Sequence, residues 1–308
     1  MRQGGAPPTG KWQGNPSGGV KAPRPVLLPD INSRFAATAT RLDVLAEGNP
    51  MEQWLRFMAQ LARAQHEAAV ALFGDVPSPN DRAVQYAVEQ RLPPLTTHGR
   101  DPAWRMGMSV ILGALGRSDP PKKIAGDIDD LRRCNEEAIE RLADSFLHGD
   151  IATADVSKAL FVAAALQVYF ASLASKLSVE QIRLLPERGL CPSCGSTPVS
   201  GIVTASGDTP GTRYLYCSLC STAWNHVRAI CITCGGARKL ELRSIEGGSD
   251  VVRAESCGDC QTYAKMLYQA KDMQVDAFAD DLATLGLDVL VSEAGWARHA
   301  PNPLLLIG

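Results

Sequence analysis

The chain has 308 residues, of which 45% are apolar and 21% are charged, as in ordinary soluble globular proteins, and it is long enough for two domains. Its net charge of -2 gives no overall attraction to nucleic acid or to an anionic membrane. The longest apolar run, residues 159–171, is shorter than the roughly 20 residues that a membrane-spanning helix needs. These values argue against a membrane-embedded protein.

Residues 1–25 are rich in glycine and proline and contain no apolar segment. A signal peptide needs an apolar core, and the start of the chain also has no twin-arginine pair. We therefore expect residues 1–25 to be a disordered tail and the protein to be cytoplasmic.

Residues 26–185 are predicted to form an all-α helical domain. Apolar side chains recur at three- and four-residue spacing, and glycine and proline clusters separate the segments. The expected helices cover residues 35–45, 51–73, 84–92, 104–115, 124–147 and 155–177. The last of these is apolar on nearly every face, so it should be the buried central helix of a bundle, with Asp155 capping its first turn. Cys134 is expected inside the fifth helix as a small buried side chain.

Eight of the nine cysteines form four Cys-x-x-Cys pairs: Cys191/Cys194, Cys217/Cys220, Cys231/Cys234 and Cys257/Cys260. Adding 40 to the first four residue numbers gives the last four, which indicates that a four-cysteine unit is repeated in tandem. Four thiolates complete the tetrahedral coordination of one ion, Zn²⁺ or iron. Disulfides are disfavoured in a chain without an export signal. The sequence therefore predicts two metal sites, each with four cysteine ligands.

The repeat favours sequential grouping, with the first four cysteines around one ion and the last four around another. A cross-braced arrangement, in which the first pair shares an ion with the third, stays open. Gly195 and Gly235 each follow the second cysteine of a pair and suit a positive φ. In each unit short strand-like segments flank a glycine-rich turn, which is typical of a hairpin in a zinc ribbon or rubredoxin. Units this short need the metal for stability.

After residue 270 the helical pattern returns. We expect one helix from Val275 to Leu287, with Asp276, Asp280 and Asp281 near its start, where acidic side chains complement the helix dipole. A docking role for the acids is also open. The tail, residues 301–306, is expected to pack onto the body of the protein.

The predicted fold class is α+β. Its expected divisions are the tail at 1–25, the α-helical domain at 26–185, a first rubredoxin-like four-cysteine unit at 186–229, a second at 230–272, and a C-terminal helix and tail at 273–308.

Several longer motifs surround the cysteines. They are Gly211-x-Arg213-Tyr214-Leu215-x-Cys217-Ser218-Leu219-Cys220 with Trp224 and Arg228, Cys231-x-x-Cys234-Gly235, Cys257-x-x-Cys260-x-x-Tyr263-x-Lys265, Ala279-Asp280-Asp281-Leu282 and Asn302-Pro303-Leu304. In this combination the chain resembles the FdhE family, the formate dehydrogenase accessory proteins. Residues 35–65 also resemble the family's helical N-terminal region.

The resemblance implies a cytoplasmic, non-catalytic maturation factor, or assembly chaperone, that binds the catalytic subunit of respiratory formate dehydrogenase. That partner is a molybdenum- or tungsten-containing iron–sulfur enzyme exported by the twin-arginine route. The resemblance also implies iron at the cysteines, about two ions per chain. The cysteine spacing by itself allows zinc equally well, because both ions accept four thiolates in a tetrahedron.

Residues near the cysteines are candidates for tuning the metal or for contacting the partner. Arg213, Arg228 and Arg253 could offset the negative charge of a four-thiolate site, or be ordinary surface arginines. Trp224 and Tyr263 occupy nearly equivalent places in the two units and are expected to pack over the cysteine turns, with partner contact as the alternative. Asp280 and Asp281 are the remaining candidates for one of these two roles.

Three other functions are weighed for a chain with four-cysteine units. A rubredoxin-like iron electron carrier would use the same sites. A nucleic-acid-binding zinc ribbon needs a basic stripe, whereas residues 187–272 carry 9 basic and 8 acidic residues of mixed order. A metal-dependent hydrolase needs an open coordination position, and eight cysteines at two sites leave none.

Overall fold

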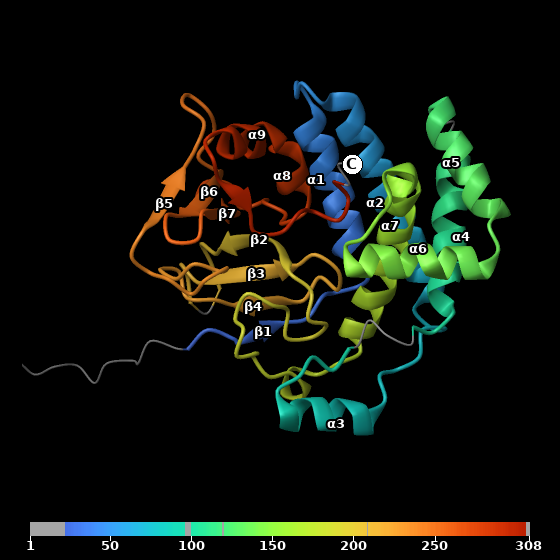
Figure 1. The fold of residues 1–308 in the computed structure, drawn as a ribbon, viewed down its shortest axis with the longest axis horizontal. Coiled ribbons are helices and arrows are strands. Elements are labelled where there is room, and N and C mark those ends of the chain that lie inside the picture. Colours follow the sequence, from blue (N-terminus) through green and yellow to red (C-terminus); the bar gives the residue numbers. More distant parts are fainter. Residues whose placement is uncertain (1–21, 96–99, 119, 208, 306–308) are drawn as a thin grey trace, which may run out of the picture.

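The computed structural model describes residues 22–95, 100–118, 120–207 and 209–305. A bundle of helices lies beside one β-sheet, and two short C-terminal helices pack next to the sheet (Figure 1). The α+β class is therefore confirmed. Most of the expected disordered tail, residues 1–21, lies outside the described residues.

The N-terminal helices are the ones that apolar periodicity predicts. Their bounds are α1 (Arg34–Ala46), α2 (Glu52–Leu72), α3 (Asp81–Gln90), α4 (Ala103–Gly116), α5 (Lys122–Arg133), α6 (Glu136–His148) and α7 (Val156–Ser175), with short 3₁₀ turns η1 (Thr153–Asp155) and η2 (Val179–Gln181). Every residue from Phe161 to Ala174 in α7 is buried, and α7 contacts α2, α4, α5 and α6. The central buried helix is therefore confirmed.

Two local predictions in this domain are wrong. The helix expected over residues 124–147 is two helices, because Cys134 takes an extended backbone with ψ 139° and the Asn135 side chain accepts from the Ala138 amide at 2.9 Å to begin α6. Cys134 is half-buried at this break. Asp155 precedes α7 but makes no capping hydrogen bond, since its backbone, with ψ -2°, continues the turn η1 and lacks the extended form of a cap.

The segment Thr153–Ser175 is long and apolar enough to cross a membrane, so the length argument made for residues 159–171 does not hold. It is the one such helix among the described residues. However, 78% of its most apolar window is buried inside the protein. Its apolar surface is therefore explained by packing in the helical core.

The strands form one sheet across both cysteine units. Their bounds are β1 (Val26–Leu27), β2 (Pro198–Val203), β3 (Arg213–Cys217), β4 (Ala223–Asn225), β5 (Leu240–Arg243), β6 (Val252–Cys257), β7 (Thr262–Tyr268) and β8 (Ala297–Arg298). Their order is β1-β4-β3-β2-β7-β6-β5, and β8 pairs with one end of β7. The short strand β1 lies in a segment that we expected to be all-α, because a two-residue strand has no detectable periodicity.

The two units are not separate modules. Each contributes three antiparallel strands, one more than the predicted hairpin, and β2 of the first unit pairs in parallel with β7 of the second. Gly201 at this junction faces Met266, and a Cβ on Gly201 would lie 2.6 Å from the Met266 Sδ. The absence of a side chain at this position therefore permits the close contact between the two units.

The C-terminal segment forms two short helices, α8 (Ala279–Ala283) and α9 (Leu285–Glu293), where we expected one. They are separated at Thr284, whose φ of -117° and ψ of 35° are not helical. The Lys265 ammonium donates to the Thr284 hydroxyl at 3.0 Å and to the Asp281 carbonyl at 2.7 Å. A buried cation thus binds polar groups at this break. Leu304 and Leu305 of the tail pack on the core as expected.

The apolar core joins the first unit to the helices. Its larger cluster contains residues of α1, α2, α4 and α7 together with Cys191, Cys194, Cys217 and Cys220. A smaller cluster contains residues of β2, β6 and β7 with Phe278 and Leu287 of the C-terminal segment. The first unit is therefore part of the helical core, whereas the second lies toward the far edge of the sheet.

Candidate metal centres

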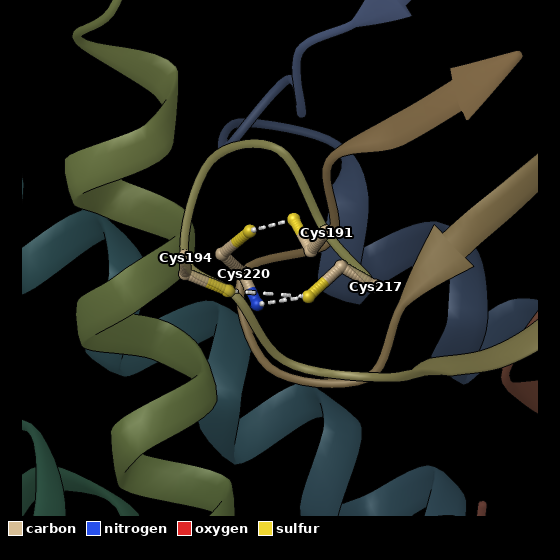
Figure 2. Close-up of side chains that lie close together, drawn as sticks. All are labelled: Cys191, Cys194, Cys217 and Cys220. Atoms are coloured by element: carbon tan, nitrogen blue, oxygen red, sulfur yellow. Dashed lines mark hydrogen bonds between the residues drawn. The ribbon is translucent and has the colours of Figure 1, made fainter. Parts of the chain in front are cut away.

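The first site consists of Cys191, Cys194, Cys217 and Cys220, whose sulfurs all lie within 4.8 Å of one another. The Sγ atoms of Cys191 and Cys220 are 3.5 Å apart, and those of Cys194 and Cys217 are 3.4 Å apart. Figure 2 shows the four side chains converging from two chain segments. The arrangement places four soft ligands around one point.

The second site consists of Cys231, Cys234, Cys257 and Cys260, again within 4.8 Å. The Sγ pairs Cys231–Cys260 and Cys234–Cys257 are both 3.7 Å apart. The grouping is therefore sequential, as the repeat of 40 residues predicts, and the cross-braced alternative is wrong. All eight cysteines are free thiols.

Both sites fit a tetrahedral ion. Four sulfurs at about 2.3 Å from a central metal are about 3.8 Å from one another. In each site two sulfur pairs are 3.4 to 3.7 Å apart, which is close to that value, and all four sulfurs lie within 4.8 Å of one another. Burial raises the pKa of the Cys191 thiol well above its ordinary value, so four buried thiolates need a cation to neutralise them. Zinc and iron both satisfy this geometry.

The repeat extends to the backbone around the sulfurs. Gly195 and Gly235 have φ of 79° and 72°, which confirms the positive φ predicted for both. The Cys191 amide donates to the Ser196 carbonyl at 2.8 Å, and the Cys231 amide donates to the Gly236 carbonyl at the same distance. Each Cys-x-x-Cys segment is therefore the same tight turn, which directs two sulfurs at one ion.

Hydroxyl groups beside the sulfurs also follow the repeat. The Thr222 Oγ1 lies 3.2 Å from the Cys220 Sγ, and the Thr262 Oγ1 lies 3.0 Å from the Cys260 Sγ. We did not single out these threonines from the sequence. Because Thr262 follows Thr222 by 40 residues, the sequence repeat could have indicated both of them. They can hydrogen-bond the ligands from outside the coordination sphere.

The two sites differ in exposure. The first-site cysteines Cys191, Cys217 and Cys220 are 0% exposed and Cys194 is 6% exposed. In the second site Cys234 is exposed and Cys260 is half-buried. The second site is therefore the more solvent-exposed of the two.

Segments of the helical domain cover the first site. In α7, Gln167 donates to the Ser218 carbonyl at 2.8 Å. Arg34 of α1 donates from Nε to the Ser221 hydroxyl at 2.9 Å, and its guanidinium lies 3.6 Å from the centre of the Phe278 ring. No sequence motif indicated Arg34. Its position next to a cysteine turn depends on how α1 packs.

Comparisons with known proteins agree over nearly the whole chain. Models of the FdhE N-terminal, central and C-terminal domains match residues 23–186, 190–228 and 229–305, respectively. The chain belongs to the FdhE family.

Relatives in the FdhE family align along most of their length. The protein FdhE homolog of Edwardsiella ictaluri is 42% identical over 297 residues, covering 95% of this chain and 94% of the relative. Protein FdhE of Salmonella typhimurium strain LT2 is 39% identical over 289 residues, covering 92% of both chains. The crystal structure of the FdhE protein from Pseudomonas aeruginosa has a TM-score of 0.81 at 33% identity and covers 92% of this chain and 99% of that chain.

In this FdhE-family chain Arg213 has a structural role. It is 1% exposed and donates to the Glu255 carboxylate at 2.6 Å and to the Ile230 carbonyl at 2.7 Å. It thereby ties β3 to the segment between the units and to β6. Arg228 is exposed and reaches the Gly211 carbonyl at 3.5 Å, and Arg253 pairs with Asp250 at 2.7 Å. These contacts of the three arginines are all to oxygen atoms and not to the cysteine sulfurs.

The two candidate aromatic residues are both buried in the sheet. Trp224 is 1% exposed and donates from Nε1 to the Arg188 carbonyl at 2.9 Å. Tyr263 is 3% exposed and donates to the Asp288 carboxylate at 2.8 Å. Their positions favour packing, one in each apolar cluster, over contact with a partner.

Asp280 and Asp281 are buried in ion pairs. Asp280 accepts two hydrogen bonds from Arg41 of α1, at 2.9 and 2.7 Å, and so joins the C-terminal segment to the helices. Asp281 pairs with Lys265 at 3.2 Å and with Arg298. Burial opposes its ionisation, but these two cations outweigh burial and hold the pKa of Asp281 below its ordinary value. Neither carboxylate is exposed for docking in this structure.

His226 predicts a pH dependence of stability. Burial, together with the nearby Arg213 cation, lowers the pKa of His226 from 6.5 to about 4. Between these values the unfolded chain binds a proton that the folded chain does not, so stability falls as the pH falls from 6.5 to 4. We expect His226 to contribute up to about 3 kcal/mol of this loss, and nothing above pH 6.5.

Urea unfolding at several pH values measures this effect. In the His226→Gln variant the free energy of unfolding should fall less between pH 6.5 and 4, by up to about 3 kcal/mol. Parallel pH profiles for the two proteins would show that His226 is not held neutral.

Proposed function

We propose that this chain is a cytoplasmic, non-catalytic accessory protein that binds the catalytic subunit of respiratory formate dehydrogenase before export and is required for its activity. The observation that carries the proposal is the match to the FdhE family from residue 23 to residue 305. Two complete four-cysteine clusters accompany that match. The family resemblance supplies the partner.

The coordination chemistry supports a non-catalytic role. A catalytic zinc or iron site keeps a coordination position open for water or substrate. Each cluster offers four sulfurs within 4.8 Å, which is a full set for a tetrahedral ion. Bound ions would then act by holding the two units in shape.

We further propose that the ion is iron, about two per chain, with zinc as the alternative. The family resemblance favours iron, and the sulfur geometry accepts either ion. Elemental analysis with an absorption spectrum of anaerobically purified protein tests this. Iron should appear with sulfur-to-iron charge-transfer bands, whereas a colourless protein that contains zinc would contradict the iron assignment.

A second candidate function is a rubredoxin-like electron carrier. The observation that favours it is the exposure of Cys234, since electron transfer needs a centre close to the surface. An electron carrier should support turnover between a reductant and an acceptor without forming a stable complex. An accessory protein should capture the catalytic subunit whatever the oxidation state of its metal.

Capture of a tagged catalytic subunit from anaerobic cells tests the accessory role. We expect the wild-type chain to co-purify with it, and the Cys234→Ser/Cys260→Ser variant to be captured at least about tenfold less if the second unit forms the docking surface. Cys134→Ser is the matched control, because Cys134 lies outside both clusters.

The outcomes separate two questions. If the wild-type chain is not captured, the proposed function is wrong. If the double variant is captured as well as Cys134→Ser, the second unit is not part of the docking surface.

A further inference from the structure

The two cysteine turns that are related by the repeat have different surroundings. At the first site the Leu95 amide donates to the Ser193 carbonyl at 2.8 Å, inside the Cys-x-x-Cys turn. A Cβ built on Gly195 would lie 3.4 Å from Pro93. Residues 93 and 95 therefore lie directly over this turn and add to the cover that α1 and α7 provide.

The equivalent turn of the second site is open. Gly235 corresponds to Gly195 by the offset of 40, and a Cβ built there would meet nothing within 4 Å. Thr233 corresponds to Ser193 and is exposed, as is Cys234. The same turn is thus covered at Gly195 in the first site and open at Gly235 in the second.

A cavity adjoins the second site. It has a volume of about 540 Å³, and its lining includes Cys231, Cys234, Leu190, Val227 and His299. This volume is sufficient for a small organic chelator. A cavity of about 630 Å³ beside the first unit is lined by Gly195, Ser196 and Ser218 among others, but by none of the four first-site cysteines. Of these two cavities, only the one beside the second site has metal-site cysteines in its wall.

His299 also lines the cavity. The His299 Nδ1 lies 2.8 Å from the Thr233 hydroxyl, which fixes the ring beside the cysteine turn. The His299 Nε2 is buried and has no hydrogen-bond partner among the described residues. A ligand in the cavity can therefore hydrogen-bond this nitrogen only if the ring moves to expose it.

From these observations we propose that the second site is a metal-exchange site. It releases its ion to, and accepts an ion from, a small thiol- or nitrogen-bearing chelator that enters the cavity, whereas the first site keeps its ion while the chain is folded. During exchange the metal–sulfur bonds break as bonds to the chelator form, and the ion keeps its charge. The freed thiolates then bind a new ion or take up protons from water. This proposal does not depend on the formate dehydrogenase partner.

Release of zinc to the coloured chelator pyridylazoresorcinol tests the proposal on the full chain loaded with two Zn²⁺ ions. We expect one ion per chain to leave in a fast phase. The second should leave at least about 100-fold more slowly, because it requires local unfolding of the helical domain. Loss of both ions at one rate overturns the proposal.

Two variants assign the fast phase. Cys234→Ser removes a second-site ligand and should abolish the fast phase while one slow ion remains. Survival of the fast phase in this variant would assign it to the first site and contradict the proposal. Val227→Trp leaves all eight ligands in place and fills the cavity, since Val227 is 56% exposed in its wall.

The cavity-filling variant should slow the fast phase by about tenfold. Val70→Trp is the matched control, because Val70 is 64% exposed on α2, away from both sites. Equal fast rates in Val227→Trp and Val70→Trp would overturn entry through the cavity.

Discussion

Cys217→Ser will destabilise the whole chain far more than Cys257→Ser, the equivalent change in the second site. Both cysteines are buried, at 0% and 1% exposed, but only Cys217 belongs to the same apolar cluster as the helices. Binding of structural zinc in finger peptides is worth about 10–16 kcal/mol, which equals or exceeds the total stability of most domains. Loss of one first-site ligand should therefore unfold the helical domain at least in part.

Circular dichroism at 222 nm during heating, with metal analysis, measures the difference. We expect Cys217→Ser to lose at least about 5 kcal/mol of stability and much of its helical signal. Cys257→Ser should lose one ion per chain and keep its helices. Cys134→Ser should behave like the wild type. Equal destabilisation by Cys217→Ser and Cys257→Ser would show that the helical domain does not depend on the first site.

Asp281→Ala should lower the free energy of unfolding by about 3–5 kcal/mol, because it leaves buried positive charge uncompensated. Asp281 and Lys265 are both 0% exposed, and Arg298 and Asp288 complete a network of two cations and two anions. The Asn302 side chain also donates to Asp281 at 3.0 Å, which joins the C-terminal tail to the network. Removal of one carboxylate leaves a net buried charge.

Equilibrium unfolding in urea measures this cost, provided that the slope is unchanged. Asp259→Ala is the control, because its ion pair with Lys239, at 3.3 Å, has side chains that are 36% and 66% exposed. That variant should lie within about 1 kcal/mol of the wild type. A comparably small effect for Asp281→Ala would mean that water reaches the network and compensates the lost carboxylate.

The first site and the Asp281 network connect parts of the chain that are distant in sequence. The first joins the helical domain to the sheet through Gln167 and Arg34. The second joins β7, the C-terminal helices and the tail through Lys265, Arg298 and Asn302. These links hold the second unit at the edge of one continuous body while its own metal site stays open to solvent.

The sequence by itself determined the features that depend on neighbouring residues. Spacing of two between cysteines specifies a tight turn, and the period of 40 favours the sequential grouping that the structure shows. Apolar periodicity located the helices of the bundle, including the buried α7. The family motifs could also be recognised in the sequence, because they consist of given residue types at fixed spacing.

Only the tertiary structure decided the burial and connection of these parts. The pairing of β2 with β7, the ion pairs of Asp280 and Asp281, and the position of Arg34 all join residues that are far apart in the chain. The contrast between the metal sites is the clearest case. Gly195 and Gly235 occupy the same turn in the repeat, yet a Cβ on Gly195 would contact Pro93, whereas a Cβ on Gly235 would meet no described atom within 4 Å. Local spacing encodes the geometry of a turn, whereas exposure depends on which distant segment packs against it.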